Sequence, residues 1–337
     1  MAEQKIIKES SIEELFKRIR AGGRRILAPV NNNGTLLFKE VDTYRAVAAD
    51  YIQTSLSAKE AVVPRCEEML RYRMEENRVI IEEGGNKPAP TVVFGVRPCD
   101  ARSFAVLNAV YAADYPDALY KSKIEGTTII GVSCSVSDEY CFCTSVGGAP
   151  GDIAGSDILL TKIEGGSFLA EVLTEKGKAL ISMAPELFAP AVHEDKDKYL
   201  ARVKRQFDME ELVKKLPGIF DASIWIDQSL RCLGCGACSY VCPACTCFDI
   251  QDETDGSSGI RLRCWDSCGF GQFTLHTSGH NPRGVQSQRW RQRVMHKFSY
   301  QPDQLKVIGC VGCGRCSRAC PADMNILHQI KDILEAQ

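Results

Sequence analysis

The sequence predicts two domains of different architecture. Residues 1–210 are expected to form an α/β domain with a mainly parallel sheet and helices, and residues 211–337 a mostly helical domain. Helix and strand patterns alternate through the first two hundred residues, which favours an α/β domain. Strand patterns then become scarce, and twelve of the seventeen cysteines lie between Cys232 and Cys320. We therefore expect metal binding, more than a large apolar core, to hold the second domain together.

The first ninety residues begin with a helix and two strands. Apolar residues recur at helical spacing over residues 12–19, which indicates one buried helix face. Short apolar runs over residues 25–30 and 36–41 flank an asparagine–glycine turn, so both are expected to be strands. Residues 58–77 are helical in composition, and we therefore expect Cys66 to be an ordinary packed thiol.

A strand–helix–strand unit follows. Residues 91–96 and 127–132 are continuous β-rich apolar runs, typical of strands that are covered on both faces of a sheet. Between them, residues 100–111 have helical spacing, and Asp100 is the expected N-cap. This unit predicts two neighbouring parallel strands joined by a helix.

The domain boundary is expected near residues 200–220. Residues 199–216 are charged and helical in pattern, and a proline–glycine pair closes them. Residues 324–336 form the expected terminal helix, with isoleucine and leucine residues on one face.

Eight cysteines in the second domain repeat one pattern twice. Both copies read C-x2-C-x2-C-x3-C-P, the ligand run of two-cluster bacterial ferredoxins, in which the fourth cysteine binds the other cluster. Zinc sites more often take two close cysteine pairs. The pattern predicts two [4Fe-4S] clusters. The first would be held by Cys232, Cys235, Cys238 and Cys320, and the second by Cys242, Cys310, Cys313 and Cys316.

A long insertion, residues 243–309, separates the two copies. It contains two further close cysteine pairs, Cys245 with Cys247 and Cys264 with Cys268. Four thiols grouped in this way could bind a further cluster or a zinc ion. Alternatively, they are buried thiols packed beside the two clusters.

Another four cysteines follow the two predicted strands of the first domain. These are Cys99, Cys134, Cys141 and Cys143. Because parallel strands bring their carboxyl ends to one edge of a sheet, these thiols are expected to meet there. The start of the following helix would favour an anionic cluster, with Asp100 as a possible substitute ligand. The sequence thus predicts a third [4Fe-4S] cluster, and the alternative is a set of buried thiols beside a plain N-cap.

Composition excludes several other classes of protein. The net charge is −2, so no overall basic field attracts nucleic acid. The basic run over residues 283–297 is expected to be a helix whose basic face is solvated or docks on an acidic partner, rather than a nucleic-acid groove. No apolar run is long enough to span a membrane, and the first residues lack the apolar core of a signal peptide. Thiolate ligands fit a reducing cytoplasm.

Several motifs together resemble one protein family. They are Gly95-Val-Arg-Pro-Cys-Asp-Ala-Arg102, Cys141-Phe-Cys-Thr144, Cys242-Pro-Ala-Cys-Thr-Cys-Phe-Asp249, Cys264-Trp-Asp-Ser-Cys268, His296-Lys-Phe-Ser-Tyr300 and the two ferredoxin runs. Over roughly residues 90–325 the chain resembles the iron–sulfur beta subunit of cytosolic sulfhydrogenase-type nickel–iron hydrogenases and its iron–sulfur counterpart in anaerobic sulfite reductase.

The resemblance implies an electron-transfer subunit of an anaerobic complex. Its expected partners are a reductase subunit that binds flavin and NAD(P), and a terminal subunit of nickel–iron hydrogenase, sirohaem sulfite reductase or heterodisulfide-reductase type. No dinucleotide-binding or P-loop glycine motif occurs, and no catalytic residue is predicted. The competing hypothesis is an iron–sulfur enzyme that has its own substrate-accessible cluster in the N-terminal domain.

Overall fold

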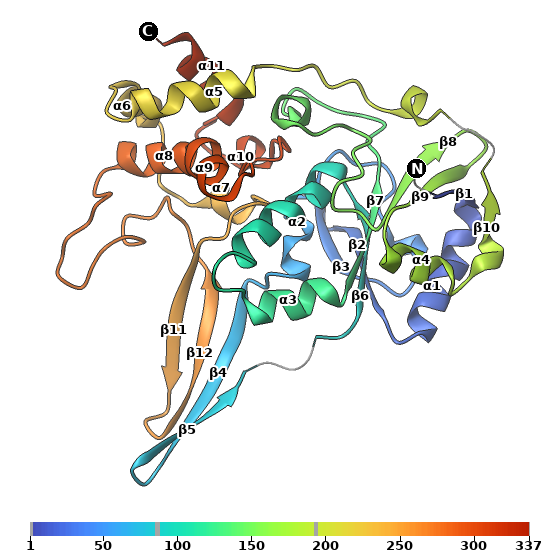
Figure 1. Ribbon diagram of the computed structural model, residues 1–337, viewed down its shortest axis with the longest axis horizontal. Helices are drawn as coiled ribbons and strands as arrows, with labels where there is room; N and C mark the ends of the chain where they lie inside the picture. Colours follow the sequence, from blue (N-terminus) through green and yellow to red (C-terminus); the bar gives the residue numbers. More distant parts are fainter. Residues whose placement is uncertain (1–2, 85–87, 192–194, 337) are drawn as a thin grey trace.

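An eight-stranded sheet forms the centre of the N-terminal domain in the computed structural model, which describes residues 3–84, 88–191 and 195–336 (Figure 1). In spatial order its strands are β10 (Phe188–Pro190), β1 (Glu3–Lys8), β9 (Ser167–Val172), β8 (Ile158–Ile163), β7 (Thr127–Val132), β6 (Thr91–Val96), β2 (Arg25–Asn32) and β3 (Thr35–Glu40). Neighbours in the series β2–β6–β7–β8 are parallel, and the outer pairings are antiparallel. The sheet is therefore mixed, and the prediction of a mainly parallel sheet holds only for its centre.

Helices cover both faces of this sheet (Figure 1). They are α1 (Ile12–Ala21) and α4 (Glu175–Ile181) on one face, and α2 (Pro98–Tyr111) and α3 (Ala118–Glu125) on the other. Strand β6 is buried along its whole length. Its residues alternate between two cores, because Val92 and Phe94 pack with Phe16 of α1 whereas Val93 packs with Leu107 of α2. The predicted strand–helix–strand unit is confirmed.

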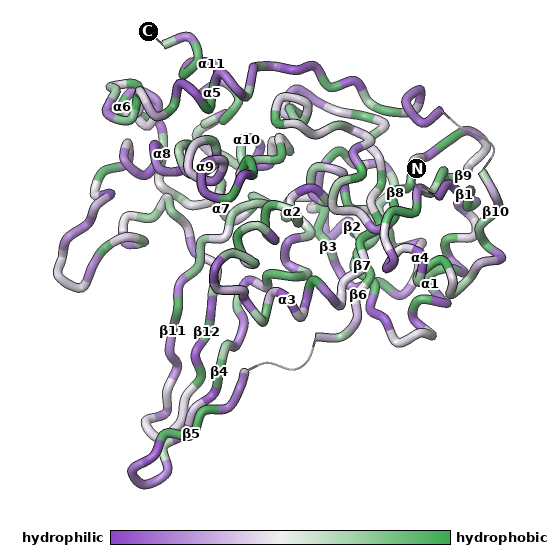
Figure 2. The backbone as a smooth tube through the Cα atoms, viewed as in Figure 1, coloured by the Kyte–Doolittle hydropathy of each residue, from purple (hydrophilic) through white to green (hydrophobic). Residues whose placement is uncertain are grey.

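A second, four-stranded sheet projects from the body of the protein as an arm (Figure 1). Its order is β11 (Phe248–Thr254), β12 (Ser258–Trp265), β4 (Cys66–Glu75) and β5 (Arg78–Glu83), all antiparallel. The predicted helix over residues 58–77 is wrong, since most of it is β4. Pairing of β4 with a strand about 190 residues later overrides the local helical composition. Figure 2 shows mixed hydropathy along the arm, in contrast to the hydrophobic central strands β6 and β7.

Helices dominate the rest of the C-terminal region. They are α5 (Met209–Lys215), α6 (Ile224–Ser229), α7 (Ala237–Tyr240), α8 (Gln286–Met295), a π-helical turn (His296–Tyr300), α9 (Gln301–Leu305), α10 (Arg315–Arg318) and α11 (Ile326–Glu335). Their shared core includes Trp225, Trp290, Phe298 and Ile330. Because the β11–β12 hairpin rises from this region, a mostly helical domain is not confirmed.

Two local predictions about the C-terminal region differ in outcome. Only residues 209–215 of the predicted 199–216 helix are α-helical, because the Asp208 side chain caps that segment by accepting from the backbone N–H groups of Glu210 and Glu211. The terminal helix is confirmed as α11, with Asn325 as its cap.

Short 3-10 turns connect the elements, at Glu9–Ser11, Tyr44–Ala46, Ala58–Ala61, Cys143–Val146, Pro185–Leu187, Lys196–Tyr199 and Leu216–Ile219. None of the helices in the described residues is long and apolar enough to cross a membrane.

Candidate iron–sulfur sites

The first ferredoxin run surrounds a cavity near the protein surface. Its wall contains Cys232, Cys235 and Cys238 from the loop around the start of α7, together with Cys320 from the second run. These are the four cysteines that the sequence analysis assigns to the first cluster, and Cys268 and Cys316 line the same cavity. The amide nitrogen of Gln286 donates to the Cys232 sulfur at 3.0 Å, which places one hydrogen-bond donor of α8 against a ligand sulfur.

The second run lies deeper in the protein. Cys313 and Cys242 belong to one buried apolar cluster with Val311 and Ala244. The ammonium nitrogen of Lys297 lies 3.4 Å from the Cys242 sulfur and donates to the Gly309 carbonyl at 2.6 Å. Burial opposes the positive charge of Lys297, yet the nearby Cys242 and Cys245 thiols raise its pKa. This lysine therefore places a stable positive charge beside the second site.

Four glycines let the backbone curl around these sites. Gly234, Gly236, Gly312 and Gly314 all have positive φ angles, between 66° and 73°. A Cβ atom on Gly312 would lie 2.5 Å from the backbone nitrogen of Cys143, so the loop fits only without a side chain there. The two runs thus share one loop conformation, which their common sequence pattern requires.

The chemistry of the cysteines matches an iron–sulfur cluster. Burial raises the pKa of Cys238 and of Cys310 to about 12, so each thiol keeps its proton unless a cation replaces it. An iron core supplies that positive charge, and the surrounding N–H groups and glycines suit its sulfurs. The residues of both runs therefore fit [4Fe-4S] clusters.

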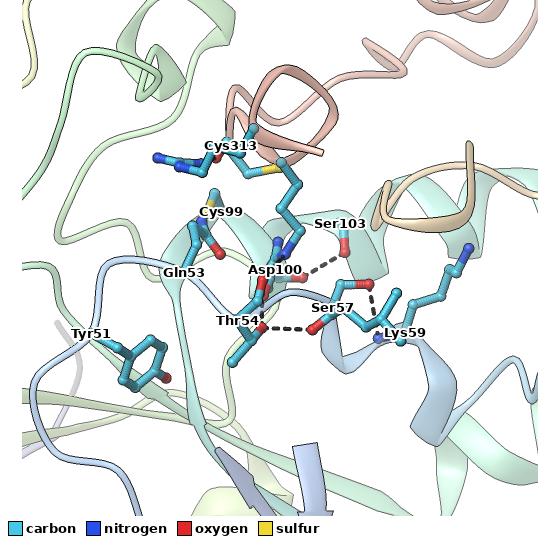
Figure 3. Close-up of polar contacts among 12 residues, drawn as sticks. Tyr51, Gln53, Thr54, Ser57, Lys59, Cys99, Asp100, Ser103 and Cys313 are labelled. Carbon is cyan, nitrogen blue, oxygen red and sulfur yellow. Dashed lines mark hydrogen bonds and ion pairs between the residues drawn. The ribbon is translucent and has the colours of Figure 1, made fainter. Parts of the chain in front are cut away.

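The N-terminal cysteines gather beside the second run. Because β6 and β7 are parallel neighbours, Cys99 at the start of α2 and Cys134 after β7 lie at one sheet edge, where Cys134 is also close to Cys141 and Cys143. Burial raises the pKa of Cys134 to about 11 and that of Cys143 to about 12. Cys99 packs against Cys313 across the domain boundary (Figure 3). The four thiols thus adjoin the second ferredoxin site.

Asp100 has a different role from the two that the sequence suggests. Helix α2 starts at Pro98 with Arg97 as its N-cap residue, so Asp100 is not the cap. Its buried carboxylate instead forms a two-pronged ion pair with the guanidinium of Arg315, which also donates to the Thr54 carbonyl at 2.8 Å. Both carboxylate oxygens accept hydrogen bonds from Arg315, so Asp100 serves in an ion pair rather than as a metal ligand.

A second ion pair connects the same two regions. The guanidinium of Arg318 pairs with the Asp138 carboxylate and donates to the Cys313 carbonyl at 2.8 Å. It also lies 3.7 Å from the Cys141 sulfur. The second run is therefore held to the N-terminal domain by two arginines of α10.

The predicted four-cysteine site in the insertion is not assembled. Cys264 is disulfide-bonded to Cys66, because the register of β12 with β4 places these two residues opposite one another. Cys66 is thus neither in a helix nor a free thiol. Cys245, Cys247 and Cys268 remain, and no group of three histidine, cysteine or acidic side chains is arranged for a single metal ion within residues 3–84, 88–191 and 195–336. This finding gives no support to zinc.

The basic run of the insertion is solvated only in part, since Arg283, Arg289 and Arg291 are half-buried. Arg293 and Lys297 are buried on the side of α8 and the π-helical turn that carries Trp290, Val294 and Phe298. The helical spacing of these three apolar residues could have indicated that this side of the helix faces the core. The expectation of a solvated basic face therefore fails for Arg293 and Lys297.

Comparisons with known proteins agree with this geometry. The 4Fe-4S dicluster domain family matches residues 231–324, which contain both runs, and this match supports two [4Fe-4S] clusters here. The chain is similar to sulfhydrogenase 2 subunit beta of Pyrococcus furiosus, with 32% identity over 332 residues that cover 96% of each chain. No solved structure matches this chain.

Proposed function

Because the chain belongs to the family of sulfhydrogenase beta subunits, we propose that it relays single electrons within a multisubunit oxidoreductase. Its expected partners are a reductase subunit that binds flavin and NAD(P), and a terminal subunit of hydrogenase, sulfite reductase or heterodisulfide-reductase type. The observation that carries the proposal is that Cys320 of the second run lines the cavity of the first site, with Cys316 beside it, which fits an exchange of the fourth ligand. Such an exchange of ligands brings two clusters close together.

The bound clusters would supply one-electron oxidation and reduction, and the protein fixes where they sit. Cys232, Cys235, Cys238 and Cys320 would hold the first, and Cys242, Cys310, Cys313 and Cys316 the second. Lys297 and the buried apolar groups around Cys242 tune the second site, because nearby positive charge favours its reduced form.

A third cluster would extend the relay into the N-terminal domain. Cys99, Cys134, Cys141 and Cys143 are its proposed ligands, and the packing of Cys99 against Cys313 supports a path between the two sites. The relay then runs from the N-terminal cysteines through the second run to the first run. The first run ends it at the surface, where Leu230 and Leu233 are exposed next to the cavity. We propose that one redox partner docks there.

Anaerobic purification tests this function. About eight irons per chain are expected for the ferredoxin pair, and about four more for the N-terminal cluster, since each cubane holds four. The Cys141→Ser variant should lose about four irons and keep the signals of the pair. Co-purifying subunits should reduce the chain with NADH or NADPH. A preparation without iron, or one that no nicotinamide-dependent partner reduces, would contradict the proposal.

A further inference from the structure

We propose that Cys245, Cys247 and Cys268 hold an additional iron–sulfur cluster at the base of the arm, beside three buried cationic side chains. This site goes beyond the relay described above, since none of its three cysteines belongs to either ferredoxin run or to the N-terminal set, although Cys268 also borders the cavity of the first run. Its ligands also differ from the four insertion cysteines that the sequence suggests, because Cys264 is bonded to Cys66.

The β11–β12 hairpin brings the three thiols together. Phe248 pairs with Trp265, so the residues just before β11 and just after β12 meet at the base of the hairpin. There the backbone N–H of Asp266 donates to the Cys247 carbonyl at 3.0 Å. The thiols of Cys247 and Cys268 are neighbours, and each shifts the pKa of the other. Antiparallel pairing therefore positions two of the thiols, and Cys245 lies two residues before Cys247.

Three buried cations surround these thiols. The side chains of Lys59, Arg293 and Lys297 belong to residues that are only 3%, 5% and 4% exposed. Arg293 lies 3.6 Å from the Cys245 sulfur and donates to the Cys238 carbonyl at 3.1 Å. Lys59 donates to the Cys245 carbonyl at 3.0 Å and lies 3.8 Å from the centre of the Trp265 ring.

None of the three cations has a carboxylate partner among the residues that the structure describes. A buried charge without a counter-charge is strongly unfavourable, so a negatively charged group is expected between them. Lys297 faces Cys242 of the second site and could be neutralised there. Lys59 is the informative residue, because its ammonium group donates to the Cys245 carbonyl. Burial lowers its pKa, and the neighbouring thiols of Cys245, Cys242 and Cys247 act in the opposite direction. An anion at the hairpin base would therefore stabilise its charged form.

An iron–sulfur cluster accounts for the charge around these thiols. Three thiolates around an iron–sulfide core carry net negative charge, which matches the cationic surroundings. They suit a three-iron core, or a cubane whose fourth iron has a ligand other than cysteine.

Serine variants of the full-length chain, purified without oxygen, test this site. Cys247→Ser and Cys268→Ser should each lose three to four irons per chain, that is, about one cluster. Electron paramagnetic resonance spectra should then lack one signal and keep the coupled signals of the ferredoxin pair. Cys264→Ser is the matched control in the same hairpin and should retain all its iron. Unchanged iron in both Cys247→Ser and Cys268→Ser would overturn the proposal.

A charge variant covers the case in which a serine variant fails to fold. Lys59→Met keeps every thiol and removes one positive charge next to Cys245. It should lower the midpoint potential of one cluster signal and leave those of the pair unchanged. If no signal shifts, or if the signals of the pair shift instead, the cluster is not at the hairpin base. Loss of the pair's signals in Cys235→Ser, in contrast, concerns the relay and not this site.

Discussion

The two ferredoxin runs have the same ligand spacing but very different surroundings. In the first run Leu233 is 71% exposed and Cys235 is exposed, whereas the corresponding Val311 is 2% exposed and Cys313 is buried. The N-terminal domain covers the second run, and the Phe142 N–H donates to the Gly312 carbonyl at 2.9 Å. The cysteine pattern therefore specifies the kind of metal site, and the residues between the cysteines decide which site faces solvent.

Two substitutions within the repeated pattern explain the difference. Arg315 stands where the first run has Ala237, and Arg318 stands where it has Tyr240. Both arginines pair with carboxylates of the N-terminal domain, whereas the first run offers no such cations at these positions. Charge complementarity thus directs the second run inward and leaves the first run for an external partner.

The largest expected effect follows from breaking the buried ion pair of the second run. Arg315→Met leaves the Asp100 carboxylate buried and unpaired, so the free energy of unfolding should fall by about 3–5 kcal/mol. Arg231→Met, at the start of the first run, removes an exposed pair with Asp323 and should cost about 1 kcal/mol or less. Urea unfolding under anaerobic conditions, followed by circular dichroism, measures both. Equal decreases in the free energy of unfolding of the two variants would show that the buried ion pair does not stabilise the second run more than the exposed pair stabilises the first.

A smaller effect is expected from paired glycine substitutions. Gly312→Ala and Gly234→Ala share the same positive φ of 66°, so their backbone cost is similar. Only Gly312→Ala brings a Cβ to 2.5 Å from backbone, whereas the nearest atom to a Cβ at Gly234 is the Gln286 side-chain oxygen at 3.1 Å. Gly312→Ala should therefore be less stable than Gly234→Ala by about 1–3 kcal/mol in the same urea assay. A reversed order would argue against close packing of the second run.

Iron removal should also distinguish the two sites. Because Cys235 is exposed and Cys313 is buried, an iron chelator in mildly oxidising buffer is expected to empty the first site before the second. Electron paramagnetic resonance spectra taken during the reaction follow the signal of each cluster. The Cys235→Ser variant identifies which signal belongs to the first cluster. Simultaneous loss of both signals would contradict the difference in burial.

The smallest effect on stability is expected for Leu233→Ser. This exposed side chain has few contacts to lose, so the free energy of unfolding should change by about 0.5 kcal/mol or less. If a partner docks at the first run, electron transfer from that partner should nevertheless slow. Val311→Ser, its buried counterpart, should destabilise the chain clearly more. Unchanged transfer in Leu233→Ser would place the docking surface elsewhere.

Local sequence patterns predicted the parts of the protein that depend on neighbours in the chain. The βαβ unit of β6, α2 and β7 follows from periodicity, and the spacing of the two cysteine runs indicates their chemistry without reference to the fold. Cys320 lines the first cavity together with Cys232, Cys235 and Cys238, which agrees with the ligand exchange known for this spacing, and Cys268 and Cys316 line the same cavity.

Contacts between distant residues account for what the sequence could not predict. Strand β4 exists because β12 pairs with it, and this pairing also joins Cys66 to Cys264. The roles of Asp100 and Lys59 depend on Arg315 and Cys245, which lie far along the chain. No local window contains both members of such a pair, so composition suggested a helix for β4 and a cap for Asp100.

The exchange of the fourth ligand is the central claim, and resonance spectra of three serine variants test it most directly. Cys320→Ser should alter the same cluster signal as Cys235→Ser, because both residues line the first site, and should leave intact the signal that Cys313→Ser alters. If Cys320→Ser instead changes the signal of Cys313→Ser, each run binds its own cluster and the proposed connection between the two sites is wrong.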